Sequence, residues 1–320
     1  MTSDEQPVVV VAGPTASGKS RLALALAREF IGTVINADSM QVYRDLRVLT
    51  ARPSDAELAL APHRLYGEID AAESCSAGHW RDLALVEIAR ARHEQRVPIL
   101  AGGTGLYLSA LLDGIAEIPA VPATVVAEAR ALHAKLGGEE FRYALAALDP
   151  VTAAKLSAAD TQRLVRAFAV VCATGIGLSE WHRRQAPHRG PVAAAVILLP
   201  SRETLYAAID RRLQDMFAAG AIEEVRALLD RQLSPSQPVM KAVGVREIGR
   251  YLAGECTRDA ALAAAQQATR RYAKRQYTWF RNRFLASKKL RKMVAETQFS
   301  AQSLPEIFSF IRQFLLTDSN

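Results

Sequence analysis

The sequence predicts an α/β protein in which helices flank a parallel sheet and a helical domain is inserted into the α/β pattern. Short apolar segments alternate with Ala- and Leu-rich stretches, as strands alternate with helices in parallel sheets. A glycine-rich run at residues 13–20 joins the first apolar segment to the first helical stretch. Between residues 119 and 191 the pattern is helical, with prolines near both ends.

The glycine-rich run has the spacing G-x-x-x-x-G-K-S of a phosphate-binding loop, so the predicted fold is of the P-loop NTPase-like type. A strand at residues 7–13 is expected before it and a helix at 22–30 after it. In this motif backbone N–H groups converge on a phosphate, the lysine reaches terminal oxygens and the serine holds Mg²⁺. The residues expected to bind a di- or triphosphate are Gly13, Pro14, Thr15, Ala16, Ser17, Gly18, Lys19 and Ser20, with Ser20 as the metal ligand.

Further strands and helices follow in alternation. Strands are expected at residues 33–38, 97–102 and 193–199, and helices at 80–95, 106–112 and 203–219. Ligands of open parallel sheets bind at the carboxyl ends of the strands. Lys19, Asp38 and Thr104 lie at such ends, so we expect them to face one cavity.

The chain is expected to form two domains. A core domain would comprise residues 1–118 and 192–320, including helices after residue 220 that carry the basic segment. The insertion would comprise residues 119–191, in which Ala and Leu recur at helical spacing. An alternative interpretation is that these helices simply pack on the sheet. The tail beyond Glu296 supports no prediction.

Several polar residues have both functional and structural interpretations. Asp38 can hold Mg²⁺, act as a general base or cap the next turn. Thr104, in a Gly-rich turn, can present its hydroxyl to a ligand or cap the following helix. Gln41 can read a base edge, and Arg211 or Arg212 can reach phosphates, but surface glutamines are common and a surface role is the preferred interpretation of both arginines.

The net charge of +7 arises from one C-terminal segment. Residues 270–292 contain ten Lys and Arg and no Asp or Glu. At about 100° per residue, Arg270, Lys274, Arg281 and Lys288 share one helix face with Tyr277. A basic stripe with an aromatic residue suits a phosphate backbone with an exposed base. A solvated helix face and an anionic membrane surface are the alternatives.

Composition argues against a secreted, membrane-spanning, zinc-binding or disulfide-bonded protein. The polar N-terminus is not a secretory or mitochondrial signal, and the longest aliphatic segment, residues 192–199, is too short to span a bilayer. Cys75, Cys172 and Cys256 are far apart, so neither a zinc cluster nor a disulfide framework is expected. We expect a cytoplasmic monomer without a membrane partner.

Six motifs in order resemble the bacterial tRNA dimethylallyltransferase (tRNA isopentenylpyrophosphate transferase) family. They occupy residues 13–20, 36–43, 102–107, 160–167, 243–247 and 268–281. The first is shared by many nucleotide-binding proteins, whereas the six together are specific. The resemblance extends over nearly the whole chain, from Val8 to Arg283.

The resemblance implies a prenyl transfer. The dimethylallyl group of dimethylallyl diphosphate would pass to N6 of the adenosine 3′ of a tRNA anticodon (position 37), giving N6-isopentenyladenosine and pyrophosphate. Asp38 would accept the amine proton, Thr104 would hydrogen-bond near the amine, and Arg212 would stabilise the leaving diphosphate together with Lys19 and Mg²⁺ on Ser20. The phosphate loop would thus serve a leaving group rather than hydrolyse ATP.

The resemblance also implies contacts with the tRNA anticodon stem-loop, whose target base would be flipped out. The implied residues come from the loop after the second strand, the insertion and the C-terminal helices. They are Asp38, Ser39, Met40, Gln41, Gln162, Arg163, Leu164, Val165, Arg166, Lys241, Gly244, Arg246, Lys274, Arg275, Tyr277 and Arg281.

Three other classes share parts of this pattern. A small-molecule kinase would use the same loop, and an adenylate isopentenyltransferase would prenylate a free nucleotide. Neither has an obvious use for the basic segment. A non-catalytic RNA-binding protein would have no need of an intact phosphate loop and Asp38.

Overall fold

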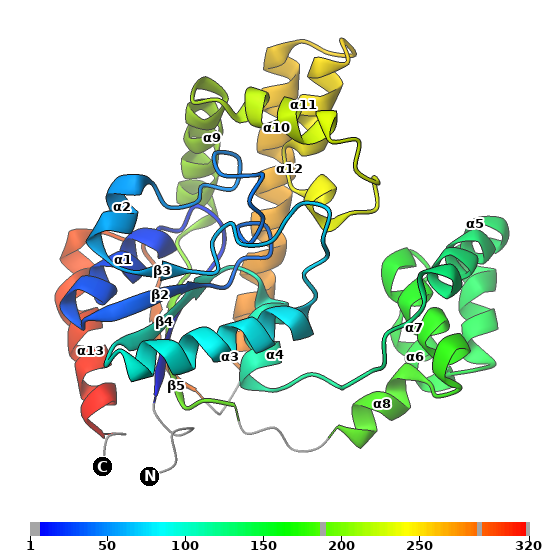
Figure 1. The fold of residues 1–320 in the computed structure, drawn as a ribbon, viewed down its shortest axis with the longest axis horizontal. Coiled ribbons are helices and arrows are strands. Elements are labelled where there is room, and N and C mark those ends of the chain that lie inside the picture. The colour runs from blue at the N-terminus through cyan, green and yellow to red at the C-terminus, as the bar shows by residue number, and fades with distance from the viewer. Residues whose placement is uncertain (1–6, 186–189, 287–289, 318–320) are drawn as a thin grey trace. The chain divides into compact units, whose positions relative to one another are not determined.

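The computed structural model describes residues 7–185, 190–286 and 290–317 (Figure 1). The chain forms two compact units, Met1–Leu112 with Gly190–Asn320, and Asp113–Arg189. The first is the core domain and the second is the helical insertion. Each has its own apolar core.

The core domain contains one parallel sheet, as predicted. Its strands among the described residues are β1 (Val8–Ala12), β2 (Gly32–Asn36), β3 (His63–Arg64), β4 (Val97–Gly102), β5 (Ala193–Leu198) and β6 (Arg291–Ala295). Their order is β3-β2-β4-β1-β5-β6, and each adjacent pair is parallel. Central strand β1 pairs Val10 with Leu100 of β4 and with Ala195 of β5. Both β1 and β5 are buried along their whole length, which explains their unbroken apolar sequences.

Helices cover this sheet and extend beyond it. They are α1 (Lys19–Glu29), α2 (Asp55–Leu60), α3 (Ala77–His93), α4 (Gly105–Leu112), α9 (Arg202–Ala218), α10 (Ala221–Asp230), α11 (Val245–Leu252), α12 (Arg258–Trp279) and α13 (Leu304–Thr317). Short 3-10 helices occur at Pro238–Lys241 and Ala301–Ser303, and a π-helical turn at Phe280–Phe284 continues α12.

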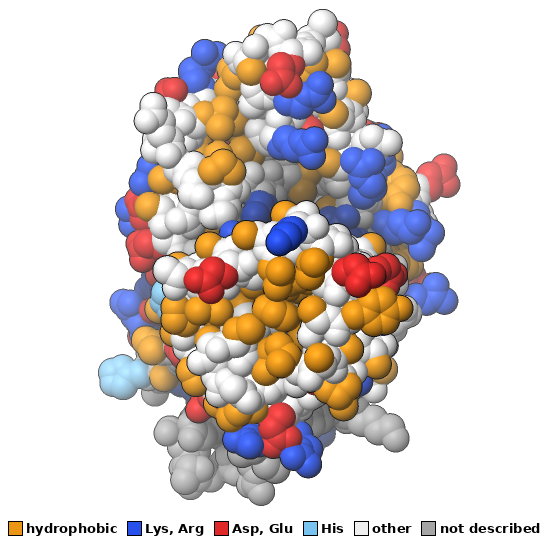
Figure 2. All heavy atoms as spheres, turned by 90° about the vertical axis from the view of Figure 1, so that its right-hand side faces the viewer, with side chains coloured by type: hydrophobic (Ala, Val, Ile, Leu, Met, Phe, Trp, Pro, Cys, Tyr) orange, Lys and Arg blue, Asp and Glu red, His pale blue; other side chains and the backbone are white. Residues whose placement is uncertain are grey.

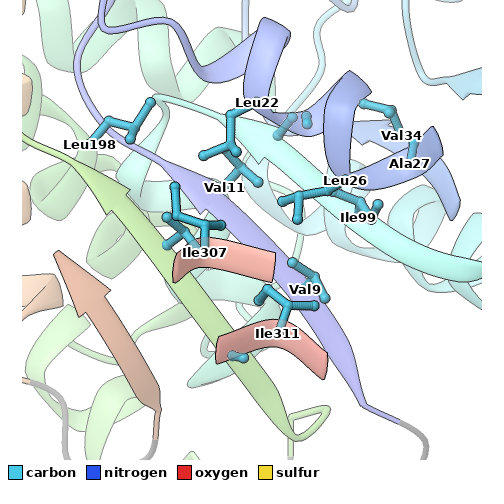
Figure 3. Close-up of a cluster of buried hydrophobic side chains, with 14 of the residues drawn as sticks. Val9, Val11, Leu22, Leu26, Ala27, Val34, Ile99, Leu198, Ile307 and Ile311 are labelled. Atoms are coloured by element: carbon cyan, nitrogen blue, oxygen red, sulfur yellow. The ribbon is translucent and has the colours of Figure 1, made fainter. Parts of the chain in front are cut away.

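The C-terminal helix α13 completes the core on the α1 side of the sheet (Figure 3). Ile307 and Ile311 pack with Leu22 and Leu26 of α1 over β1 residues such as Val9. These side chains are almost fully buried. The apolar spacing i, i+4 in α13 places both isoleucines on one helix face.

The structure corrects the expectation of an all-helical chain after residue 220, because β6 forms the edge strand beside β5. Its first two residues, Arg291 and Lys292, are the last two of the basic segment, and the strand is partly exposed. Charged residues are common on edge strands because they discourage pairing with other chains. This strand therefore lacks the apolar run that identified the central strands.

The insertion is a helical unit. It contains α5 (Ala123–Ala146), α6 (Pro150–Lys155), α7 (Thr161–Thr174) and α8 (Leu178–Arg184), and no strand among its described residues. Helix α5 bends at Gly137, which has φ 77°. Phe141 and Leu145 of α5 pack against Leu164 and Val165 of α7. Figure 2 shows apolar side chains spread over the surface of this unit.

In the described part of the chain, no single helix is long and apolar enough to cross a membrane, although α7 and α8, bent by 75°, pass that test as a pair by length and composition.

Asp149 joins two short helices of the insertion. Its carboxylate accepts hydrogen bonds from the backbone N–H and hydroxyl of Thr152 (3.1 and 2.6 Å) and of Ser179 (3.0 and 2.7 Å). Burial would raise the pKa of this carboxyl, but the four hydrogen bonds outweigh burial and lower the pKa to about 2. The ionised form therefore stabilises the insertion.

We expect Asp149→Asn to destabilise the insertion by about 1–3 kcal/mol near neutral pH, because an amide cannot accept all four bonds. The stabilisation by Asp149 is fully present above the unfolded-state pKa of about 4 and is lost as the pH falls toward 2. Hydrogen–deuterium exchange of α6 and α8 amides measures it. Asp160→Asn is the control, since Asp160 caps α7 through one 3.4 Å bond. Equal effects of both changes would contradict the assignment.

Candidate active site

The phosphate loop connects β1 to α1 and lies against the end of β5. Gly13 has φ 146°, and a Cβ atom there would lie 2.4 Å from the carbonyl oxygen of Leu198. No other residue type fits this close approach without moving the backbone. The loop is thus held at the carboxyl ends of the two central strands, where the sequence predicted it.

Two partly buried cations meet at the loop. Lys19 Nζ donates to the carbonyl of Pro14 (2.8 Å), and Arg212 of α9 donates from Nη2 to the Thr15 hydroxyl (2.5 Å). Burial lowers the pKa of Lys19 to about 8; nearby Asp38 opposes this shift and Arg212 adds to it. Burial also lowers the pKa of Arg212, and Asp38 again opposes the shift. The structure therefore brings together Lys19, Arg212 and Asp38 from three elements.

Two buried donors at this site have no hydrogen-bond partner among the described residues. They are the Ser17 hydroxyl and Nε of Arg212. Buried polar atoms are normally paired, so these two are suited to an acceptor that binds here. The N-terminus of α1 and the two cations favour an anion with several oxygen atoms. A diphosphate has this chemistry.

Ser20 follows Lys19 in α1, and its side chain is exposed. Among the described residues, no group of three or more His, Cys, Asp and Glu could hold a metal ion. Mg²⁺ commonly takes one or two protein ligands and completes its shell with substrate phosphates and water. A single hydroxyl beside a diphosphate site fits this pattern.

Asp38 lies just beyond β2 in a turn held by Asn36. The Asp38 N–H donates to Asn36 Oδ1 (2.9 Å), and Asn36 Nδ2 donates to the carbonyls of Asp38 and Leu65 (both 3.0 Å). One carboxylate oxygen of Asp38 accepts the Met40 N–H (2.9 Å). Asp38 thus caps its own turn, as one interpretation of the sequence proposed, and this contact fixes its carboxylate.

Thr104 lies beside that turn. Its hydroxyl accepts the Ser39 N–H (2.9 Å) and contacts the Ser39 hydroxyl at 3.3 Å. Burial, followed by the charge of Asp38, raises the pKa of the Tyr272 hydroxyl of α12, and the neighbouring Thr104 side chain opposes this shift. Asp38, Ser39 and Thr104 therefore form one polar cluster, as expected for residues at neighbouring strand ends.

The Gln41 side chain stabilises the loop that follows Asp38. Its Nε2 donates to the carbonyls of Thr50 and Ala51 (2.8 and 3.1 Å), which closes the loop after Asp38. Met40 beside it is partly exposed. Whether Gln41 reads a base remains a prediction.

The basic face of α12 differs from the predicted stripe. Arg270 donates to both carboxylate oxygens of Asp210 on α9 (2.6 and 2.7 Å), and the Arg202 guanidinium lies 5.8 Å from the Tyr277 ring centre. The reason is that α12 packs against α9 on this side. Arg281 is exposed, and Lys288 lies outside the described residues.

A basic hollow lies on the exposed side of the same helix. It has a volume of about 580 Å³ and is lined by Arg271, Lys274, Arg275, Thr278, Trp279, Asn282 and Arg283. Their spacing of three and four residues places them on one helix face. This hollow combines cations with an aromatic ring, the features expected of a surface for a nucleic acid.

The remaining residues implied in tRNA contact include some with exposed side chains and some that are buried. Those with exposed side chains are Gln162, Arg163, Arg166, Lys241 and Arg246. Gly244 is buried at the start of α11. The prediction is wrong for the side chains of Leu164 and Val165, because both are buried in the insertion core. One face of α7 packs on that core along its length, so a continuous run of its residues cannot be exposed.

Fold and site together define a P-loop-type protein with an anion site beside a carboxylate and a basic helix face. The chain belongs to the IPP transferase family, whose model matches residues 41–283. It is 50% identical over 320 residues to the tRNA dimethylallyltransferase of Paramagnetospirillum magneticum, covering 99% of both chains. It is 53% identical over 286 residues to that of Rhodospirillum centenum, covering 89% of this chain and 91% of the relative.

Solved structures agree with this assignment. The tRNA isopentenylpyrophosphate transferase from Bacillus halodurans superposes with a TM-score of 0.69 at 31% identity, covering 98% of each chain. A eukaryotic dimethylallyltransferase acting on tRNA superposes with a TM-score of 0.80 at 25% identity, covering 97% of this chain and 80% of that one.

Two residues next to the site were not predicted to belong to it. Tyr272 contacts Thr104, and Gln276 contacts the phosphate loop. Both lie within the basic motif of α12, whose many Lys and Arg residues indicate a surface for an anion and carry no signal for the inner face of the helix. An amphipathic analysis of residues 268–281 would have placed them on the inner face.

The pKa of Lys19 predicts the pH dependence of diphosphate binding. Above about pH 8 the free protein loses the Lys19 charge, so pyrophosphate affinity should fall with rising pH, by up to about tenfold per pH unit. Isothermal titration calorimetry with pyrophosphate measures this. Lys19→Arg should lack this component because a guanidinium stays charged. Identical pH profiles of the two proteins would rule out Lys19 as the titrating group.

Proposed function

We propose that this chain transfers a dimethylallyl group from dimethylallyl diphosphate to N6 of the adenosine 3′ of the anticodon, position 37, in tRNA. The observation that carries the proposal is the convergence at the phosphate loop of two partly buried cations, Asp38 and two buried donors that have no partner among the described residues. Membership of the IPP transferase family supports the same chemistry.

The donor's diphosphate is the leaving group. Lys19, the Arg212 guanidinium and the loop N–H groups would bind it and stabilise the negative charge that grows as the C1–O bond breaks. Mg²⁺ held by Ser20 would neutralise part of this charge when bound. Because these groups are already in place around the loop, little reorganisation is needed when the charge develops.

The acceptor amine is a poor nucleophile, since its lone pair is delocalised into the adenine ring. In the transfer the N6 lone pair forms a bond to C1 of the dimethylallyl group, and the C1–O electron pair leaves with pyrophosphate. The N6 proton passes to the Asp38 carboxylate. Asn36 orients that carboxylate through the turn backbone, and Thr104 would hydrogen-bond beside the amine.

The tRNA would bind over the hollow on α12. Arg271, Lys274, Arg275 and Arg283 offer four cations for phosphates, and Trp279 offers a ring for stacking. Exposed residues of α7 in the insertion, such as Arg163, and Lys241 and Arg246 in the core domain would add further contacts. The target base would have to leave its stack to reach Asp38.

Asp38→Asn tests the proposal. We expect the transfer rate to fall by about 10²–10⁴-fold, since an amide cannot accept the amine proton. Radiolabelled dimethylallyl diphosphate with Mg²⁺ and unmodified tRNA measures transfer, and filter binding measures tRNA affinity, which should stay nearly unchanged. AMP and ATP replace tRNA in parallel. Label entering AMP or ATP would instead identify a free-nucleotide enzyme, and an unchanged rate would remove Asp38 as the base.

Lys274→Ala tests the basic hollow. Loss of one phosphate contact should weaken tRNA binding and reduce the slope of log K against log salt concentration by roughly 1. Arg28→Ala removes an exposed charge from α1 and serves as the control, with an unchanged slope expected. The hollow would lose its assigned role if Lys274→Ala left the slope as it is.

A further inference from the structure

Gln276 connects the two loops that form the site. Its Nε2 donates to the carbonyl of Gly103 (2.8 Å), and its Oε1 accepts the backbone N–H of Thr15 (2.8 Å). The side chain comes from α12 and is 6% exposed. We name the contact of Gln276 with Thr15 and Gly103 the glutamine bridge.

The hydrogen-bonding groups of Thr15 and Gly103 explain why a glutamine lies between them. Thr15 N–H can only donate and the Gly103 carbonyl can only accept, so one planar group must supply both an acceptor and a donor. A carboxylate lacks the donor, and an apolar side chain leaves both partners unpaired in a buried site. A glutamine amide satisfies both at once.

The backbone at residue 103 is adapted to this contact. A Cβ atom on Gly103 would lie 2.3 Å from Gln276 Nε2 and 3.1 Å from the carbonyl oxygen of Gly13. The phosphate loop, the turn before Thr104 and the amide are therefore in direct contact.

The glutamine bridge contacts residues on the leaving-group side and on the acceptor side of the proposed reaction. Thr15 also receives the Arg212 guanidinium on its hydroxyl, so it belongs to the leaving-group side. Gly103 directly precedes Thr104, which contacts Ser39 next to Asp38 on the acceptor side. Lys274 of the basic hollow lies on the opposite face of the same helix.

We propose that Gln276 is a positioning residue for prenyl transfer, which sets the spacing between the phosphate loop and the Thr104 turn. The inference rests on the proposed function, because it concerns the alignment of donor and acceptor. Alignment errors of about 1 Å can cost about 100-fold in rate without a loss of binding. The bridge should therefore affect the transfer step more than tRNA affinity.

The test compares Gln276→Leu and Gln276→Glu in single-turnover prenyl transfer at saturating tRNA and donor. Gln276→Leu should lower the rate by about 10–100-fold, with the tRNA dissociation constant unchanged. Gln276→Glu should lower it near neutral pH, because the carboxylate faces the Gly103 carbonyl. As the pH falls, the protonated carboxyl regains a donor, so its rate relative to the unaltered protein should rise. The same ratio for Gln276→Leu should stay flat.

Gln266→Leu is the matched control. Gln266 lies on the same helix and donates to the carbonyl of Asp210 (3.1 Å), away from both loops, so its loss should leave the rate unchanged. The inference is overturned if Gln276→Leu transfers at the unaltered rate, or if the Gln276→Glu ratio does not change with pH. Absence of transfer by the unaltered protein would instead refute the proposed function, before any variant is compared.

Discussion

The parallel pairing of β1 with β4 on one side and β5 on the other is the constraint on which the site depends. Because all three strands run in one direction, their carboxyl ends meet at one edge of the sheet. The phosphate loop follows β1, and the Thr104 turn follows β4. Asp38 follows β2, which pairs with the other side of β4. Residues far apart in the sequence therefore meet at this one edge of the sheet.

The site holds positive charge in a partly buried position. Burial lowers the pKa of the Lys19 ammonium group to about 8, and Nε of Arg212 has no hydrogen-bond partner among the described residues. Burial of unsatisfied cationic groups costs stability, and an anion that binds there removes the cost. Helix α12 brings this site into contact with the basic hollow, because Gln276 and Tyr272 lie on its inner face and Lys274 on its outer face. One helix thus joins the proposed tRNA surface to the reacting groups.

Local patterns in the sequence were sufficient for the central strands and the phosphate loop. Val8–Ala12 and Ala193–Leu198 are continuous apolar runs, and the loop motif has fixed spacing. The edge strand β6 was not predicted, since its basic sequence carries no strand signal. Helix α13 was also missed, although Ile307, Ile311 and Phe314 have helical spacing. The sequence could not show which face of α12 is exposed. Arg270 pairs with Asp210 of α9, and that contact depends on how the two helices pack in the folded chain.

The central claim is that the phosphate loop holds a leaving group and does not hydrolyse a nucleotide. The most direct measurement is the stoichiometry of products from dimethylallyl diphosphate and tRNA, with pyrophosphate and orthophosphate assayed separately and ATP present. The account predicts pyrophosphate equal in amount to prenylated tRNA and no orthophosphate formed from ATP. Release of orthophosphate in step with tRNA modification would contradict it and assign the loop to nucleotide hydrolysis.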